Sequence, residues 1–165
     1  MKEKRSSSTE SFYDTFESPV GTLYLIFTGK ILRGIDFKRP NEMLRRGNSP
    51  SLIKKELREY FEHGRDDFTQ KIGLLKGTEF DHKVWLALRE IPYGETRTYK
   101  WLAEKTDKPG AFRAVGQSLS RNPIPIILPC HRVIESDGSI GGYSAGVDIK
   151  RRLLEIEYYS KLAKR

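Results

Sequence analysis

Residues 122–133 have the sequence NPIPIILPCHRV, and this stretch decides how the second half of the chain folds. Residues 122–129 are apolar apart from Asn122 and contain three prolines. Proline removes a backbone donor and disfavours helical geometry at the residue before it, so this segment cannot be a helix. We predict an extended apolar connector that delivers the chain directly to Cys130 and His131.

Upstream of the connector, two short helices are predicted within a basic segment. Residues 98–106 and 111–121 have helical patterns and are separated by the turn sequence DKPG, which is typical of a helix-turn-helix. Between positions 97 and 132, seven basic residues stand against two acidic ones, a net charge of +5. Concentrated positive charge favours a polyanionic partner, although a solvated basic face has the same pattern.

Further helices are expected on both sides of this region. Thr78 is a suitable N-cap for a helix that ends at Pro92, and acidic residues follow it in the first turn. After Cys130, residues 138–146 form a glycine-rich loop, and apolar residues between 153 and 159 indicate a last helix.

The first part of the chain predicts a small α+β unit. Three β-rich runs, at residues 12–16, 22–27 and 31–37, are separated by turn signals and indicate a three-stranded antiparallel sheet. A polar loop over residues 39–49 follows, and then a helix that Gly64 stops. We therefore divide the chain into a disordered tail (1–10), an α+β scaffold domain (11–76) and a mostly helical domain (77–165).

Composition limits the classes of function. The chain has 165 residues, a net charge of +8 and 37% hydrophobic residues, enough for a packed core. It has no apolar run near the ~20 residues that span a membrane and no signal-peptide pattern, so we expect a cytoplasmic protein without membrane contact. A single cysteine excludes an internal disulfide and a multi-cysteine zinc site, and we expect no metal and no cofactor.

Cys130 is the candidate nucleophile. The thiolate is the reactive form of cysteine, and because a free thiol has a pKa of about 8.5 it needs a nearby base or cation. His131 and Arg132 follow it directly. An isolated cysteine in an apolar stretch is nevertheless more often a small buried hydrophobe, so these residues alone leave catalysis and packing as alternatives.

The motifs around Cys130 resemble the O6-alkylguanine-DNA alkyltransferases, also called methylated-DNA–protein-cysteine methyltransferases. PCHRV (129–133) is preceded by RAVG (113–116) and NP (122–123), and it is followed by GYS (142–144). The resemblance extends from residue 77 to about residue 157. It implies an α+β fold with an RNase-H-like N-terminal domain, a helix-turn-helix that enters the minor groove of double-stranded DNA, and a guanine flipped into a pocket.

The resemblance also implies four catalytic residues. Cys130 resembles the sulfur that accepts the alkyl group, irreversibly and once per molecule, from O6 of guanine or O4 of thymine. His131 resembles the base that removes the thiol proton through a water, and Glu157 the carboxylate that orients His131. Tyr99 resembles the tyrosine that donates a hydrogen bond to the guanine ring.

Two further groups of residues follow from the same resemblance. Arg113 resembles the arginine that fills the gap left by the flipped base, and the other residues expected at DNA are Thr98, Ala114, Gly116, Gln117, Ser120 and Arg121. The residues expected around the pocket are Leu119, Asn122, Val133, Ile140, Gly141, Tyr143, Ser144 and Ala145. Ala145 stands where relatives often have glycine, so we expect a narrow pocket that favours methyl over benzyl-sized adducts.

Four hypotheses of function can be compared at this point. The first is a monomeric repair alkyltransferase that acts on double-stranded DNA containing O6-alkylguanine. The second is a protein that recognises the lesion, flips the base and recruits other repair factors; the presence of Cys130 favours the first over it. The third, a cysteine hydrolase, has no need of a basic helix-turn-helix. The fourth is a helix-turn-helix regulator with a structural cysteine.

Overall fold

The computed structural model describes residues 10–164, so the tail predicted over residues 1–10 lies outside the described part except for Glu10. Strands β1 (Ser11–Ser18), β2 (Gly21–Thr28) and β3 (Ile31–Asp36) pair antiparallel, as predicted. The loop predicted over residues 39–49 is only partly a loop, because β4 (Arg45–Arg46) pairs parallel with β1 and extends the sheet to the order β3-β2-β1-β4. The two residues of β4 are too few for their hydrophobic pattern to predict a strand.

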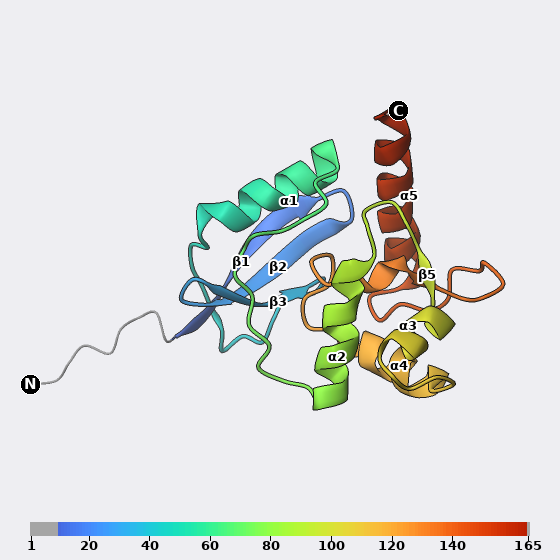
Figure 1. Cartoon of the computed structure of the whole chain (residues 1–165). Helices are drawn as coiled ribbons and strands as arrows, with labels where there is room; N and C mark the ends of the chain where they lie inside the picture. The colour runs from blue at the N-terminus through green and yellow to red at the C-terminus, as the bar shows by residue number, and fades with distance from the viewer. Residues whose placement is uncertain (1–9, 165) are drawn as a thin grey trace, which may run out of the picture.

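The N-terminal core forms between the sheet and helix α1 (Ser51–His63). Leu23, Leu25 and Phe27 alternate along β2 and are fully buried, as the two-residue period of a strand requires. Figure 1 shows α1 lying over this sheet, whereas α2, α3 and α4 form a separate group. Gly64 ends α1 in the left-handed conformation at φ 68°, which confirms the predicted stop.

The C-terminal half contains four α-helices: α2 (Glu79–Ala87), α3 (Tyr99–Lys105), α4 (Phe112–Ser120) and α5 (Val147–Ala163). Thr78 caps α2 in a capping box with Asp81, which confirms the predicted N-cap. A 3-10 turn, η2 (Leu88–Glu90), extends α2 towards Pro92. Two short strands, β5 (Arg97–Thr98) and β6 (Val133–Ile134), were not predicted from the sequence and pair parallel.

Helix α4 is held against α2 by buried polar contacts. The Asp81 carboxylate accepts hydrogen bonds from the Ser118 hydroxyl (2.5 Å) and from the Arg121 guanidinium (2.7 Å). The Trp85 indole donates to the Ser118 carbonyl (2.7 Å). Burial raises the pKa of Asp81, but Arg121 and Ser118 outweigh this effect and lower it well below its usual value, so the carboxylate is ionised. These bonds fix the second helix of the helix-turn-helix.

The connector at residues 122–129 is not a helix, as predicted, but it is compact rather than extended. The Leu128 N–H donates to the Ile124 carbonyl (2.9 Å), and Ile126 has a φ of 78°. The Asn122 side chain closes the turn, because its amide donates to the Leu128 carbonyl (2.8 Å) and its oxygen accepts from the Ile124 N–H (3.0 Å). A side chain that satisfies backbone groups in this way makes a chain reversal possible without helix.

The elements of the two halves confirm the predicted α+β class, and the two halves share one hydrophobic core. Residues of β2 and α1 belong to the same buried cluster as Leu102, Val115 and Leu128 of the C-terminal half. The connector also bonds the sheet directly, since the Ile35 N–H donates to the Pro123 carbonyl (2.9 Å). Within residues 10–164, no helix is both long enough and apolar enough to cross a membrane.

Asp14 supplies a stability contribution that depends on pH. Burial raises the pKa of Asp14, but hydrogen bonds from Ser49, Lys54 and Thr15 outweigh burial and lower it to about 2 from its ordinary 3.8. A pKa depressed by folding stabilises the native state above the ordinary value and loses this effect as the pH falls towards the folded value. We expect Asp14→Asn to lower the free energy of unfolding by about 2 kcal/mol at neutral pH.

Urea denaturation as a function of pH measures this effect. The difference between Asp14→Asn and the parent protein should shrink once the pH falls below the ordinary value of 3.8. Asp148→Asn is the control, because that carboxylate is fully exposed and should change little. A difference that stays constant down to about pH 2 would contradict the assignment.

Candidate active site

Cys130 lines a cavity and is itself buried. It begins the 3-10 turn η3 (Cys130–Arg132), directly after the compact connector, and only 6% of its surface is exposed. The cavity has a volume of about 300 Å³. Its lining comes from α3, α4 and the glycine-rich loop as well as from the cysteine: Tyr99, Gly116, Leu119, Ser120, Cys130, Gly142, Tyr143 and Ser144.

The environment of the thiol keeps it protonated. Burial raises the pKa of Cys130, and the neighbouring side chains of Asn122 and Tyr143, together with the charge of Lys150, only partly oppose this effect. A cysteine whose pKa is raised by burial is a neutral thiol at neutral pH and a poor nucleophile. The sulfur therefore needs a base before it can react.

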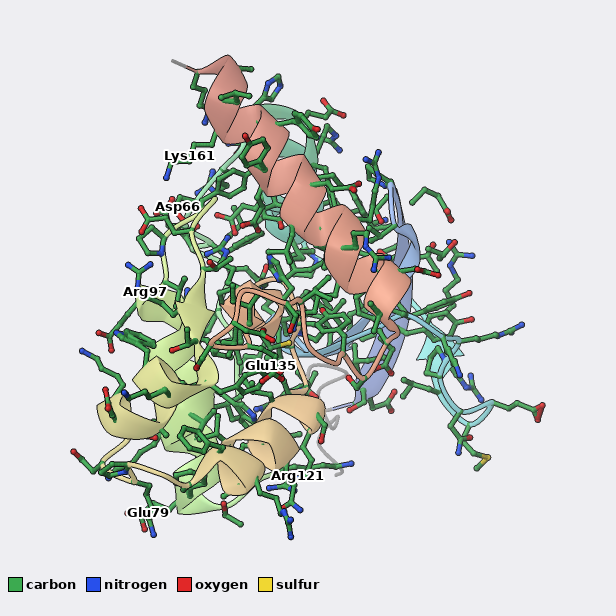
Figure 2. All side chains as sticks on the ribbon, turned by 90° about the vertical axis from the view of Figure 1, so that its right-hand side faces the viewer. Asp66, Glu79, Arg97, Arg121, Glu135 and Lys161 are labelled. Carbon is green, nitrogen blue, oxygen red and sulfur yellow. The ribbon has the colours of Figure 1, made fainter. Side chains whose placement is uncertain are left out.

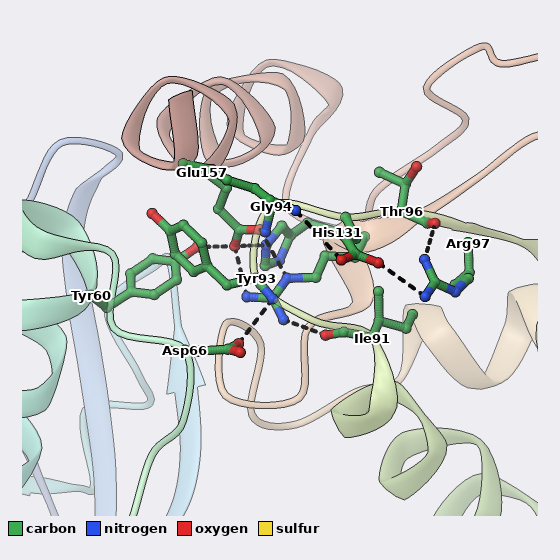
Figure 3. Close-up of polar contacts among 12 residues, drawn as sticks. Tyr60, Asp66, Ile91, Tyr93, Gly94, Thr96, Arg97, His131 and Glu157 are labelled. Atoms are coloured by element: carbon green, nitrogen blue, oxygen red, sulfur yellow. Dashed lines mark hydrogen bonds and ion pairs between the residues drawn. The ribbon is translucent and has the colours of Figure 1, made fainter. Parts of the chain in front are cut away.

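A base is available in His131, which is paired with Glu157. The His131 Nε2 and the Glu157 Oε2 are 2.6 Å apart, and both side chains are buried (Figure 3). The same carboxylate accepts from the Arg132 Nε (2.9 Å), the Gly94 N–H (3.0 Å) and the Tyr60 hydroxyl (2.5 Å). Burial raises the pKa of Glu157, but His131 and Arg132 outweigh it and lower the pKa well below its usual range, so Glu157 is a carboxylate.

This arrangement assigns the proton on the His131 ring. Because the Glu157 carboxylate only accepts hydrogen bonds, the neutral ring must carry its proton on Nε2. The Nδ1 atom of His131 is buried and has no hydrogen-bond partner among residues 10–164. Its lone pair is therefore free to take a proton, as the base of a nucleophile, base and carboxylate series does.

Tyr99 lines the cavity, and the buried Lys150 side chain lies beside its ring. Burial raises the pKa of Tyr99, and the charges of Glu135 and of a Cys130 thiolate raise it further, so Tyr99 is a neutral phenol that can donate a hydrogen bond. The Lys150 ammonium lies 5.9 Å from the centre of the Tyr99 ring and donates to the Val133 carbonyl (2.8 Å) and the Gly142 carbonyl (3.1 Å). Burial lowers the pKa of Lys150 to about 8.

Sequence reasoning did not single out Lys150, although a signal for it existed. Lys150, Leu153 and Glu157 are the buried residues of α5, and they follow each other at helical spacing of three and four. A lysine on the buried face of a helix must find partners for its charge. Its two carbonyl acceptors show that it holds the glycine-rich loop against β6.

The predicted pocket residues are only partly brought together. Leu119, Tyr143 and Ser144 line the cavity. Gly141 lies beside Tyr99, because a Cβ at this position would be 3.1 Å from the Tyr99 hydroxyl. Ala145 does not line the cavity, so the structure gives no support for the expected narrowing by its methyl group.

Two other predicted pocket residues lie elsewhere. Ile140 lines a separate cavity between α5 and the segment around Thr96. Val133 is fully buried, and its carbonyl already accepts from Lys150. The Cys130 carbonyl accepts from the Val133 N–H. A carbonyl oxygen has two lone pairs, so each of these oxygens can accept one further hydrogen bond.

The predicted DNA-binding residues fall into two groups. Arg113, Gln117 and Ser120 are exposed on α4, Ala114 is half-buried, and a Cβ at Gly116 would meet nothing within 4 Å. Thr98 and Arg121 are already engaged, because the Thr98 hydroxyl oxygen caps α3 and Arg121 is bonded to Asp81. Figure 2 shows Arg121 beside α4, with Glu135 in the loop between that helix and α5.

The basic segment carries less free charge than its sequence indicates. Within it, four cations form ion pairs: Arg97 with Glu95, Lys105 with Glu90, Arg121 with Asp81 and Arg132 with Glu157. Arg132 is also buried and cannot meet a polyanion. Lys100, Lys108 and Arg113 form no ion pair with any described residue, so they are the cations of this segment that remain for a partner.

Known proteins match this chain over nearly its full length. The family model described as the 6-O-methylguanine DNA methyltransferase ribonuclease-like domain matches residues 11–74, and the DNA binding domain of the same family matches residues 79–159. The methylated-DNA–protein-cysteine methyltransferase of Methanosarcina barkeri is 44% identical over 153 residues, which is 88% of this chain and 96% of that relative. The ribonuclease-like class expected for the N-terminal half is thereby confirmed.

Solved structures agree with these matches. The crystal structure of the Mycobacterium tuberculosis O6-methylguanine methyltransferase is 38% identical and has a TM-score of 0.84, covering 91% of this chain and 94% of that chain. The structure of the Mycobacterium tuberculosis protein OGT in complex with DNA is 39% identical and has a TM-score of 0.84, covering 90% and 94%. The chain belongs to the 6-O-methylguanine DNA methyltransferase family, which confirms the resemblance found in the motifs around Cys130.

Proposed function

We propose that this protein repairs DNA by moving a methyl or other small alkyl group from O6 of guanine, or O4 of thymine, to the sulfur of Cys130. The observation that carries the proposal is that the buried Cys130 lines a cavity of about 300 Å³. Membership of the family supports alkyl transfer from DNA as the reaction. The paired His131 and Glu157 supply the base that this buried thiol requires.

The chemistry is a displacement at the alkyl carbon. His131 takes the thiol proton on Nδ1 through a water, and Glu157 stabilises the resulting imidazolium. The thiolate attacks the carbon, a carbon–sulfur bond forms, and the bond from that carbon to O6 breaks. The electron pair of the broken bond goes to the guanine, which accepts one proton and leaves as the neutral base. The thiol proton is thus balanced by the proton that guanine takes up.

Tyr99 assists the departure of the base. Its phenol lines the cavity and retains its proton, because its pKa is raised by burial. A hydrogen bond from this phenol to the guanine ring stabilises the negative charge that develops as the alkyl group is lost. The backbone N–H of Ser144, on the opposite loop, is suited to address O6.

In this proposal, helix α4 is the element that contacts DNA. Arg113, Gln117 and Ser120 are its exposed polar residues, and Gly116 leaves room for close approach along the same helix. We place α4 in the minor groove of duplex DNA, with the target base flipped into the cavity and the Arg113 guanidinium in its place. The protein acts as a monomer in the cytoplasm in this proposal.

One protein molecule repairs one lesion. The product at Cys130 is a thioether, which water does not cleave under cellular conditions, and the chain has no second cysteine that could take the group. The protein is therefore consumed in its own reaction. DNA is the only partner that the reaction needs.

Intact mass spectrometry tests the proposal directly. After incubation with a duplex that contains O6-methylguanine, we expect a mass increase of one methylene unit, located on the peptide that contains Cys130, at one equivalent per molecule. Cys130→Ser should bind the same duplex without the mass change. A parent protein that binds the duplex and stays unmodified would overturn the proposal and favour recognition without chemistry.

Arg113→Ala separates base flipping from chemistry. Because flipping a base costs a few kcal/mol, we expect the variant to react about 10 to 100 times more slowly with methylated duplex DNA. Its reaction with the free base O6-methylguanine should stay within about threefold of the parent rate. Arg151→Ala removes an exposed arginine of α5 and serves as the control. Equal losses on both substrates would contradict the role of Arg113.

The dependence of DNA binding on salt tests which cations face the phosphates. We expect Lys100→Ala to reduce the slope of log affinity against log salt by about 0.9, the value for one phosphate contact. Lys105→Ala should reduce it less, since Glu90 already pairs with that lysine. Fluorescence anisotropy with an unmodified duplex measures both slopes. A larger change of slope in Lys105→Ala than in Lys100→Ala would show that the ion pairs do not determine which cations contact the phosphates.

A further inference from the structure

We propose that Tyr60, on helix α1 of the N-terminal half, is a positioning residue of the alkyl-transfer site that acts through Glu157. Its hydroxyl group fixes the Glu157 carboxylate and shares the charge on which His131 depends. The inference rests on the proposed function, because it assigns Tyr60 a part in activating Cys130. It gives the N-terminal half a task in the reaction beyond that of a scaffold.

The contact between Tyr60 and Glu157 is direct and buried. The Tyr60 hydroxyl donates to the Glu157 Oε2 at 2.5 Å, although the two residues are 97 positions apart in the sequence. The same oxygen accepts from the His131 Nε2 at 2.6 Å (Figure 3). Tyr60 and the base therefore share one carboxylate oxygen, and neither side chain has measurable exposure to solvent.

Aromatic packing holds the Tyr60 ring in place. The ring meets Phe61 edge to face at 4.9 Å and Tyr93 edge to face at 5.6 Å, and Phe68 is tilted against it at 5.9 Å. Edge-to-face pairs of this kind fix ring orientation as well as bury surface. The hydroxyl of a ring held on several sides keeps a constant direction towards Glu157.

The charges around Glu157 explain why a neutral donor matters there. From η3, His131 and Arg132 donate to the carboxylate, and from the segment before β5 the Gly94 N–H donates to it. The Tyr93 hydroxyl is close enough to interact with the charge of Glu157, but it donates no hydrogen bond to it. Each donor disperses the negative charge and makes the carboxylate a weaker acceptor. Without the Tyr60 hydroxyl, more charge is left on the oxygen that faces His131. The imidazolium form of His131 is then favoured, and less of the free base is present at a given pH.

The state of the phenol agrees with this role. Burial raises the pKa of Tyr60 well above its usual value, and the Glu157 charge and hydrogen bond raise it further. Tyr60 therefore keeps its proton at neutral pH and acts as a donor. Asp66 accepts the Tyr93 N–H at 2.9 Å, so this carboxylate of the same region already has a hydrogen-bond partner.

The rate of methyl transfer as a function of pH tests the proposal, with the parent protein and Tyr60→Phe on methylated duplex DNA. We expect the acidic limb of the profile to move to higher pH by about half a unit to one unit in Tyr60→Phe. The plateau rate above that limb should stay within about threefold of the parent rate. A merely structural role would lower the rate by the same factor at every pH and leave the limb where it is.

Tyr93→Phe is the matched control. It removes a buried tyrosine hydroxyl from the same aromatic cluster, but that hydroxyl makes no hydrogen bond to Glu157. Its profile should keep the parent midpoint. If Tyr60→Phe does not fold, 4-aminophenylalanine at position 60 keeps the shape of the ring and a weaker hydrogen-bond donor. The midpoint of its acidic limb should then lie at higher pH than that of the parent protein. A limb that stays fixed in the folded Tyr60 variant would overturn the proposal.

Nitrogen NMR of His131 separates failure of this inference from failure of the proposed function. The chain has three histidines, and the signals of His131 are those absent from His131→Gln. Near pH 6, Tyr60→Phe should show a larger share of the doubly protonated ring than the parent protein, whether or not any methyl group is transferred. Equal shares would overturn the inference even if Cys130 is methylated as proposed.

Discussion

The rest of the structure depends on one buried charge, the Glu157 carboxylate. An ionised carboxylate inside a protein is costly unless donors surround it, and breaking one partner of such a group destabilises the fold strongly. Here the donors come from α1, from the segment before β5 and from η3. Because no single half of the chain can supply them, the sheet domain, the connector and α5 must assemble together around Glu157.

Local signals in the sequence predicted most of the secondary structure. The alternation in β2, the Thr78 cap and the Gly64 stop each depend on residues within a few positions, and all three are present. The compact turn at Ile126 was missed, because it depends on side-chain bonds of Asn122 that proline positions do not reveal. Propensity excluded the helix, but it did not determine what replaced it.

The candidate site was predictable only where a motif carried it. The pairing of His131 with Glu157 joins residues 26 positions apart, and the family resemblance placed them together before the structure did. Tyr60 and Lys150 had no such motif. Both residues contribute only through the tertiary structure, because the acceptors of their polar atoms lie on segments distant in the sequence. A count of charges likewise does not reveal the ion pairs that engage four of the seven basic residues in this segment.

The proposed chemistry explains why Cys130 is buried. A sulfur that reacts once must not be consumed by chance electrophiles or oxidants, and these attack the thiolate rather than the thiol. Burial raises the pKa of Cys130 and keeps it as the thiol, and the His131 Nδ1 atom has no hydrogen-bond partner in the described part of the chain. Deprotonation then depends on a water and a substrate in the cavity. Under the proposed function, the network around Glu157 therefore does not make Cys130 generally reactive, because the base that it supplies is used only when an alkylated base fills the site.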